Sequence, residues 1–296
     1  MTGSRQQEAG RRQESRTASV TPPGVASRVD SFGLSDVGKV RTTNEDHFVI
    51  ASLWKSVALE HTNIDDQEQF ERMRGSSARL FIVADGVGGR SRGELASGTA
   101  VESLVQYLAQ TVGCFNSADL TKEHEFLKQL EGAVQRTHER IQAELGSGGH
   151  GPSTTLTMVT LIGTRAYIVH VGDSRAYQFH QGRLRPLTVD QTMGRYMVDV
   201  GAWTEEQAAR AKISTNLTSA LGSSEMLPKV GIADLVAGDT LLMCTDGLSN
   251  EVPEARITEL LGSGDDAESV AKALVQAALD GGGSDNVTVV VAKIGA

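Results

Sequence analysis

The sequence has little of what marks secreted, membrane-spanning or disulfide-bonded proteins. Its 296 residues include only two cysteines, Cys114 and Cys244. They lie far apart and form neither a zinc-binding spacing nor a disulfide framework. No apolar run is long enough to cross a bilayer, and the N-terminus lacks the hydrophobic segment of a secretory signal. We therefore expect a cytoplasmic protein that does not enter a membrane.

Positive charge is also in short supply. The chain has 28 Lys and Arg against 37 Asp and Glu, which gives a net charge of −9. A nucleic-acid-binding surface needs clustered basic residues, so this balance argues against a nucleic-acid partner. With 39% hydrophobic and 22% charged residues, the composition is that of an ordinary globular protein with a real core.

The first 28 residues differ in composition from the rest. They are rich in Arg, Gln, Ser and Thr and contain too little apolar surface to order themselves. We expect residues 1–28 to form a disordered polar tail and residues 29–296 to form the folded domain.

Four aspartates each stand next to a strongly apolar segment. Asp85 follows the apolar residues 80–84, and glycines come directly after it. The same pattern recurs at Asp173 and Asp246, and it appears reversed at Asp285, which precedes residues 287–291. The short apolar segments predict buried strands. For one such aspartate taken alone, a helix cap is favoured over a cation ligand.

The repetition of this pattern favours a metal site. Strand ends of one sheet can converge, and converging carboxylates repel one another unless cations neutralise them. A dinucleotide cradle is the alternative for the glycines after Asp85. It is disfavoured because Ser91 occupies the last position of the required glycine spacing, and because Asp85 would repel a pyrophosphate.

A turn segment near the N-terminal end of the folded part contains residues suited to binding a phosphate group and a cation. Arg41 lies a few residues before Glu45 and Asp46. The planar fork of an arginine suits a phosphate group, and paired acids suit a cation. The alternative is an exposed loop with a local ion pair, which contributes little.

The periodicity predicts helices and strands in separate groups. Helices are expected over residues 93–112 and 120–145 and near 253–261 and 266–280, with a small helical excursion within 190–231. Strands are expected between these groups, joined by short links that imply antiparallel pairing. This order is typical of an α+β fold in which helices cover antiparallel sheets.

These motifs together carry a family resemblance. From Phe32 to Ile294 the chain resembles the metal-dependent Ser/Thr protein phosphatases of type 2C (the PPM family), particularly the compact bacterial members. The matching motifs are Gly38-x-x-Arg41-x-x-Asn44-Glu45-Asp46, Asp85-Gly86-x-Gly88-Gly89, Gly172-Asp173-Ser174-Arg175, Thr245-Asp246-Gly247 and Ser284-Asp285-Asn286-Val287-Thr288. The resemblance implies a four-layer αββα sandwich, with two antiparallel β-sheets flanked by antiparallel helix pairs.

The resemblance also implies a role for each matched residue. Asp85 would bridge two tightly bound Mn²⁺ or Mg²⁺ ions, and Asp246 and Asp285 would complete the first of them. The Gly86 carbonyl would serve the second ion, with Glu45 and Asp46 acting mostly through waters. Asp173 would bind a third, weaker ion. Arg41 would hold the substrate phosphate, so that the catalytic residues are Arg41, Asp85 and Asp246.

The implied activity is hydrolysis of phosphoserine and phosphothreonine in proteins, by attack of a metal-activated water without a phosphoenzyme. The expected partners are phosphoproteins made by a cognate Ser/Thr kinase, and a monomer is expected. Residues 190–231 would form the variable flap of the family. The alternative is a catalytically silent member of this fold that binds a phosphoprotein.

Three positions depart from the family pattern. Val87 stands where some members have a histidine, and Asn250 replaces an acid after the second Asp-Gly motif. Gln191 stands where many relatives have a histidine. The sequence assigns no role to Gln191.

Overall fold

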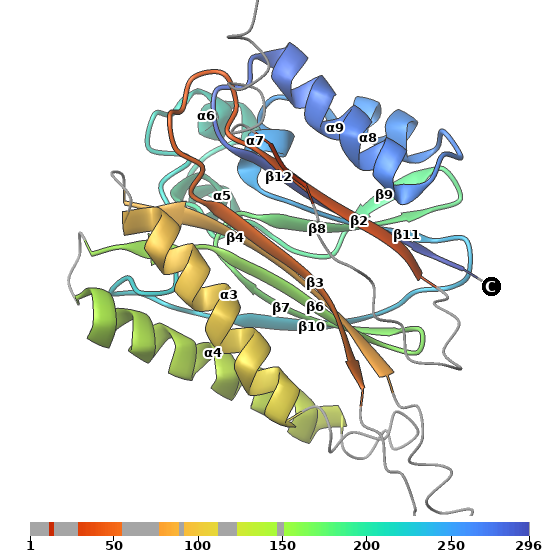
Figure 1. Ribbon diagram of the computed structural model, residues 1–296. Helices are drawn as coiled ribbons and strands as arrows, with labels where there is room; N and C mark the ends of the chain where they lie inside the picture. The colour runs from red at the N-terminus through yellow and green to blue at the C-terminus, as the bar shows by residue number, and fades with distance from the viewer. Residues whose placement is uncertain are drawn as a thin grey trace, which may run out of the picture.

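Two antiparallel β-sheets lie face to face in the computed structural model (Figure 1). The structure describes residues 12–14, 29–54, 77–88, 92–111, 123–146 and 151–295. The first sheet has the strand order β1 (Arg12–Glu14), β2 (Val29–Asp36), β12 (Val287–Ile294), β11 (Thr240–Cys244), β8 (Arg175–His180) and β9 (Arg183–Pro186). The second has the order β10 (Lys229–Asp234), β7 (Arg165–Val171), β6 (Leu156–Ile162), β4 (Ser77–Val87) and β3 (Asp46–Trp54).

Helices cover the outer face of each sheet. α3 (Arg92–Thr111) and α4 (Glu123–Leu145) pack on the second sheet, and α8 (Glu254–Leu261) and α9 (Ala267–Gly281) pack on the first (Figure 1). A further apolar layer, with Phe81 and Met243 at its centre, fills the space between the sheets. The predicted four-layer αββα sandwich is therefore confirmed.

The central strand shows why its sequence is apolar without alternation. Leu80 and Ile82 pack toward the helices, whereas Phe81 and Val83 pack toward the other sheet, and all four are fully buried. A strand covered on both faces needs apolar side chains at every position. The strand does not end at Asp85, however. It continues to Val87 because its last residues pair with the short β5 (Ser153–Thr154).

A short piece of the N-terminal segment belongs to the first sheet. Most of residues 1–28 lies outside the described residues, but Arg12–Glu14 form β1 and pair antiparallel with β2.

Cys244 is fully buried in β11, and burial raises the pKa of its thiol to about 12. Cys244 is thus an inert hydrophobic side chain.

The segment 190–231 leaves the sheet as predicted and forms two short helices, α5 (Met193–Asp199) and α6 (Glu205–Arg210). Thr204 caps α6 through a reciprocal pair of hydrogen bonds with Gln207. One further helical turn, α7 (Asp246–Ser249), follows β11 directly. Within the described ranges, no helix combines the length and the apolar character needed to span a bilayer.

Candidate metal and phosphate site

One end of the sandwich collects the predicted site residues. In the second sheet β3 begins at Asp46, β4 carries Asp85 near its end, and Asp173 follows β7. In the first sheet β11 ends just before Asp246, and β12 begins just after Asp285. The β2–β3 loop and α7 lie at this same end (Figure 1). Strand ends therefore converge as predicted, but they come from both sheets rather than from one.

Asp46 and Asp85 lie directly opposite each other in the β3–β4 register. Like charges at such positions destabilise a sheet. The Asp46 side chain is only 1% exposed, and its Oδ2 accepts hydrogen bonds from the hydroxyls of Thr245 (2.9 Å) and Thr288 (2.7 Å). Burial nevertheless raises the pKa of Asp46 to about 7. The Asp46 carboxylate therefore lies where burial disfavours its charged form.

Asp85 is the electrostatic centre of the cluster. Its pKa lies well above the usual range, first because of burial and then because of the charges of Asp46, Asp246, Asp173 and Asp285, in that order. Its backbone N–H donates to the hydroxyl of Thr155 at 3.0 Å, on the neighbouring strand end. The structure therefore brings all four partners close enough to Asp85 to act on its charge.

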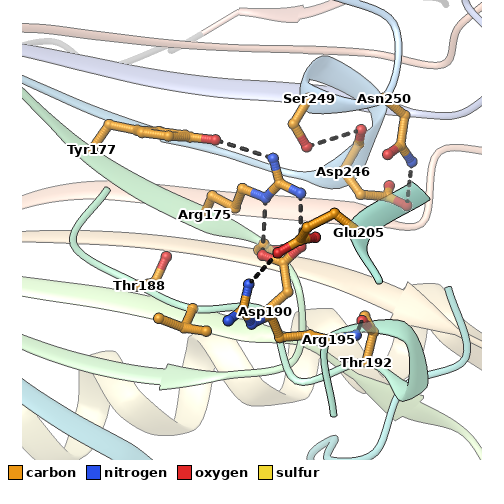
Figure 2. Close-up of polar contacts among 12 residues, drawn as sticks. Arg175, Tyr177, Thr188, Asp190, Thr192, Arg195, Glu205, Asp246, Ser249 and Asn250 are labelled. Carbon is orange, nitrogen blue, oxygen red and sulfur yellow. Dashed lines mark hydrogen bonds and ion pairs between the residues drawn. The ribbon is translucent and has the colours of Figure 1, made fainter. Parts of the chain in front are cut away.

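Asp246 is held by one side-chain donor, whereas Asp285 has two donors, because its Oδ1 also accepts from the Asn286 backbone N–H at 2.8 Å. The amide of Asn250 donates to Asp246 Oδ2 at 3.0 Å (Figure 2), and the Arg41 guanidinium donates to Asp285 Oδ2 at 2.6 Å. Burial, followed by the charge of Asp285, raises the pKa of Asp246. Arg41 is thus drawn to the carboxylates, with about half of its side chain exposed to solvent.

The loop that carries Arg41 is fixed by a residue to which the sequence assigns no separate role. The buried Asn286 accepts from the Glu45 backbone N–H at 2.8 Å through its side-chain oxygen. Its amide nitrogen donates to the carbonyls of Val37 (3.0 Å) and Thr43 (2.9 Å). The residue after Asp285 therefore clamps the loop on both sides of Arg41.

Glu45 and Gly86 meet at the cross-strand step next to Asp46 and Asp85. The Gly86 backbone N–H donates to the Glu45 carbonyl at 3.1 Å. A Cβ at Gly86 would lie only 2.3 Å from the Gly93 carbonyl oxygen, so only glycine fits there. Glu45 is buried, and this burial raises its pKa.

Asp173 sits on a turn that also requires glycine. Gly172 has φ +104°, and a Cβ there would meet the Thr155 side chain at 2.7 Å. Gln191 secures this turn, since its side-chain oxygen accepts from the Gly172 N–H at 2.9 Å and its amide donates to the Leu227 carbonyl at 2.8 Å. Burial, with the charge of Asp246, raises the pKa of Asp173 to about 8.

The donor set suits a hard divalent cation. Glu45 Oε1, Asp46 Oδ1 and Asp246 Oδ1 are buried and have no hydrogen-bond partner. Buried carboxylate oxygens of this kind need donors or cations, and oxygen ligands are those that Mg²⁺ and Mn²⁺ prefer. Among the described residues, no three His, Cys, Asp or Glu side chains already stand in a ready-made metal-binding arrangement. The three unpartnered oxygens are the observation that fits a hard divalent cation here.

Comparison with known proteins decides the family. A family model described as Protein phosphatase 2C matches residues 60–281. The chain belongs to the protein phosphatase 2C family. Arg41, Glu45, Asp46 and Asp285 lie outside that matched range.

The curated relatives are bacterial phosphatases. The serine/threonine protein phosphatase PstP of Mycobacterium tuberculosis (strain ATCC 25618 / H37Rv) is 38% identical over 221 residues, which is 74% of this chain and 41% of PstP. The chain thus matches about two-fifths of that relative's length. The serine/threonine phosphatase stp of Listeria innocua is 32% identical over 79% of this chain and 91% of its own.

A solved structure shares the phosphatase 2C fold. The catalytic domain of a serine/threonine protein phosphatase PstP, in complex with two manganese ions, superposes with a TM-score of 0.69 and is 31% identical. The match covers 90% of this chain and 99% of that chain.

The raised pKa of Asp46 makes the metal-free protein sensitive to pH. The folded state binds this proton more tightly than the unfolded chain, so its stabilisation is lost progressively as pH rises from about 4 to about 7. In a chelator we expect unfolding free energy to fall by about 2–3 kcal/mol between pH 5 and pH 7 from this group. Denaturant titration should show a smaller fall in Asp46→Asn, and an equal fall in both proteins would contradict the assignment.

Proposed function

We propose that this protein is a divalent-metal-dependent phosphatase that hydrolyses phosphoserine and phosphothreonine in proteins, without a phosphoenzyme. The observation that carries the proposal is the convergence of five aspartates at one end of the sandwich, where Asp46 and Asp85 lie opposite each other and Asp46 Oδ1 and Asp246 Oδ1 are buried without a hydrogen-bond partner. Arg41 supports it, because its guanidinium reaches the same cluster through Asp285. Family membership and the manganese-bound relative point in the same direction.

The proposed metal ligands are those that the family resemblance implies. Asp85, Asp246 and Asp285 would hold the first Mn²⁺ or Mg²⁺ ion. Asp85 and the Gly86 carbonyl would hold the second, and Glu45 and Asp46 would reach the ions mostly through waters. The unpartnered buried oxygens of Glu45, Asp46 and Asp246 support the binding of cations at this cluster. Asp173 would bind a third ion more weakly, because Asn250 adds no charge to that site.

The chain's own residues prepare the site for a phosphate ester. When bound, the cations lower the pKa of a water and offset the charge of the phosphate. Arg41 offers a planar, charge-assisted fork to the phosphate oxygens at the solvent-exposed side of the cluster. Val87 takes the position where some relatives have a histidine, and it cannot give a proton to the leaving alkoxide. The cluster therefore acts through orientation and charge.

The alternative, a silent member of the fold that binds phosphoproteins, is less well supported because every matched acid and Arg41 is present at the site. Phosphoprotein substrates of a cognate kinase, a monomeric state, a cytoplasmic location and the action of residues 190–231 as a flap stay predictions. Turnover of a phosphothreonine peptide separates the two functions.

Removing one carboxylate charge should abolish metal-dependent turnover. Asp246→Asn keeps the shape of the side chain but weakens its hold on a hard cation. We expect loss of phosphopeptide hydrolysis and of manganese binding by calorimetry, with a near-wild-type unfolding midpoint in chelator. Asp265→Asn, an exposed change at the other end of β12, should keep both. Full activity of Asp246→Asn, or activity of the wild type in chelator, would contradict the proposal.

Arg41→Ala should weaken engagement of the phosphate. Losing a charge-assisted bidentate contact costs on the order of 1.5–3 kcal/mol, so kcat/KM should fall roughly ten- to a hundredfold. Arg41→Lys keeps the charge without the planar fork, so its kcat/KM should lie between those of the wild type and Arg41→Ala. Steady-state kinetics on a small phosphate ester measure this directly, and an unchanged kcat/KM for Arg41→Ala would remove Arg41 from the site.

Asp173→Ala tests the weaker ion. We expect the two tight ions to remain in calorimetric titration, while the Mn²⁺ concentration needed for half-maximal phosphopeptide turnover rises. The turn itself is held by Gly172 and Gln191, so the fold should persist. If the variant loses the tight ions, or matches the wild type at every metal concentration, Asp173 does not bind a third ion.

A further inference from the structure

A cavity of about 500 Å³ is lined by residues of the 190–231 segment and of the second sheet. Ile168 and His170 of β7 and Val230 and Gly231 of β10 contribute one side of its lining. Tyr196 of α5 and Leu227, which precedes β10, contribute the other. Its volume lies within the range of cavities that hold a ligand or several side-chain groups.

The rim of this cavity is apolar and exposed. Val189, Tyr196 and Leu227 are 62%, 54% and 60% exposed, and Val230 is 38% exposed. Single exposed hydrophobic residues are ordinary on a protein surface. Four of them around one hollow form a patch that gains free energy when another apolar group covers it.

Three of the charged groups in the lining, Asp190, Arg195 and Asp199, are engaged in ion pairs, and the fourth, Lys229, is exposed. Asp190 accepts two bonds from the Arg175 guanidinium, at 2.9 and 2.7 Å, and Figure 2 shows Arg175 held between Asp190 and Tyr177. Arg195 is paired with Asp199 and, at 3.2 Å, with Glu205. A charged ligand would have to compete with these pairs.

The histidine of the lining adds no charge. His170 Nδ1 lies 3.0 Å from the Thr157 hydroxyl, and Nε2 lies 3.2 Å from the Val189 carbonyl. Burial lowers the pKa of His170 to about 4, so the ring is neutral at physiological pH. The cavity therefore favours an apolar occupant.

Gln191 connects the cavity to the proposed metal site. It lines the cavity, and its side-chain oxygen accepts from the N–H of Gly172, the residue before Asp173. Neighbouring Cα atoms are about 3.8 Å apart, so Asp173 lies roughly 10 Å or less from this wall. An extended peptide advances about 3.3 Å per residue. A substrate residue two to four positions from the reacting one can span the distance from this wall to Asp173, whose charge acts on Asp85.

We propose that the cavity binds a large apolar side chain of the protein substrate, two to four residues from the phosphorylated serine or threonine. The proposal rests on the proposed function, because the phosphorylated residue must occupy the metal site. The occupant is an aliphatic or aromatic side chain such as Leu, Met or Phe. The cavity thereby sets which phosphoproteins are favoured substrates.

The test uses the full chain and a set of phosphothreonine peptides. A reference peptide has alanine on both sides of the phosphothreonine, and each test peptide carries one leucine at a position from four before to four after it. We expect leucine at one position two to four residues away to raise kcat/KM roughly tenfold or more over the reference. Leucine next to the phosphothreonine should have little effect.

Two matched variants locate the effect. Leu227→Asp places a charge on the cavity rim, whereas Val236→Asp changes a similarly exposed residue that does not line the cavity. Leu227→Asp should lose the gain from leucine but hydrolyse the alanine peptide and a small aryl phosphate like the wild type. Val236→Asp should keep the gain.

The outcomes separate this proposal from the proposed function. Equal kcat/KM for all peptides, or a leucine gain that survives in Leu227→Asp, would overturn the cavity as a specificity site while leaving the phosphatase intact. A protein that hydrolyses neither the peptides nor the aryl phosphate would overturn the proposed function itself, and the specificity proposal with it.

Discussion

The structure depends on a repulsion: Asp46 and Asp85 face each other across two paired strands at a buried end of the sandwich. Water cannot screen charges well there, and two threonine hydroxyls offset only part of the cost for Asp46. Asp246 and Asp285 bring further negative charge to the same place from the other sheet. Such an arrangement is stable in ionised form only when cations share it.

The rest of the fold holds these charges in position. Three apolar layers fix both sheets, so the register that opposes Asp46 and Asp85 cannot slip without turning core side chains toward solvent. Asn286 clamps the Arg41 loop, and Gln191 ties the segment 190–231 to the turn before Asp173. Elements distant in sequence thus meet at one end, and the same Gln191 joins the metal site to the apolar cavity.

The sequence predicts the layers and the individual site residues well, because each depends on a local pattern. The apolar segment before Asp85 predicts a strand buried on both faces, and the recurring Asp-Gly steps single out the acids. The opposition of Asp46 and Asp85 is a matter of strand register, which neighbouring residues do not encode. The continuation of β4 beyond Asp85 depends on pairing with β5, some 65 residues away along the chain. Gln191 gains a role only through its contact with Gly172.

The most direct measurement is calorimetric titration of the metal-free protein with Mn²⁺ at pH 6.5, in buffers of different ionisation enthalpy. Because Asp46, Asp85 and Asp173 hold protons more tightly than ordinary carboxylates, we expect binding to release more than one proton per chain. The Asp46→Asn variant should release fewer protons per chain when it binds Mn²⁺. Mn²⁺ binding without proton release, or no binding at all, would contradict a buried carboxylate cluster that is completed by divalent cations.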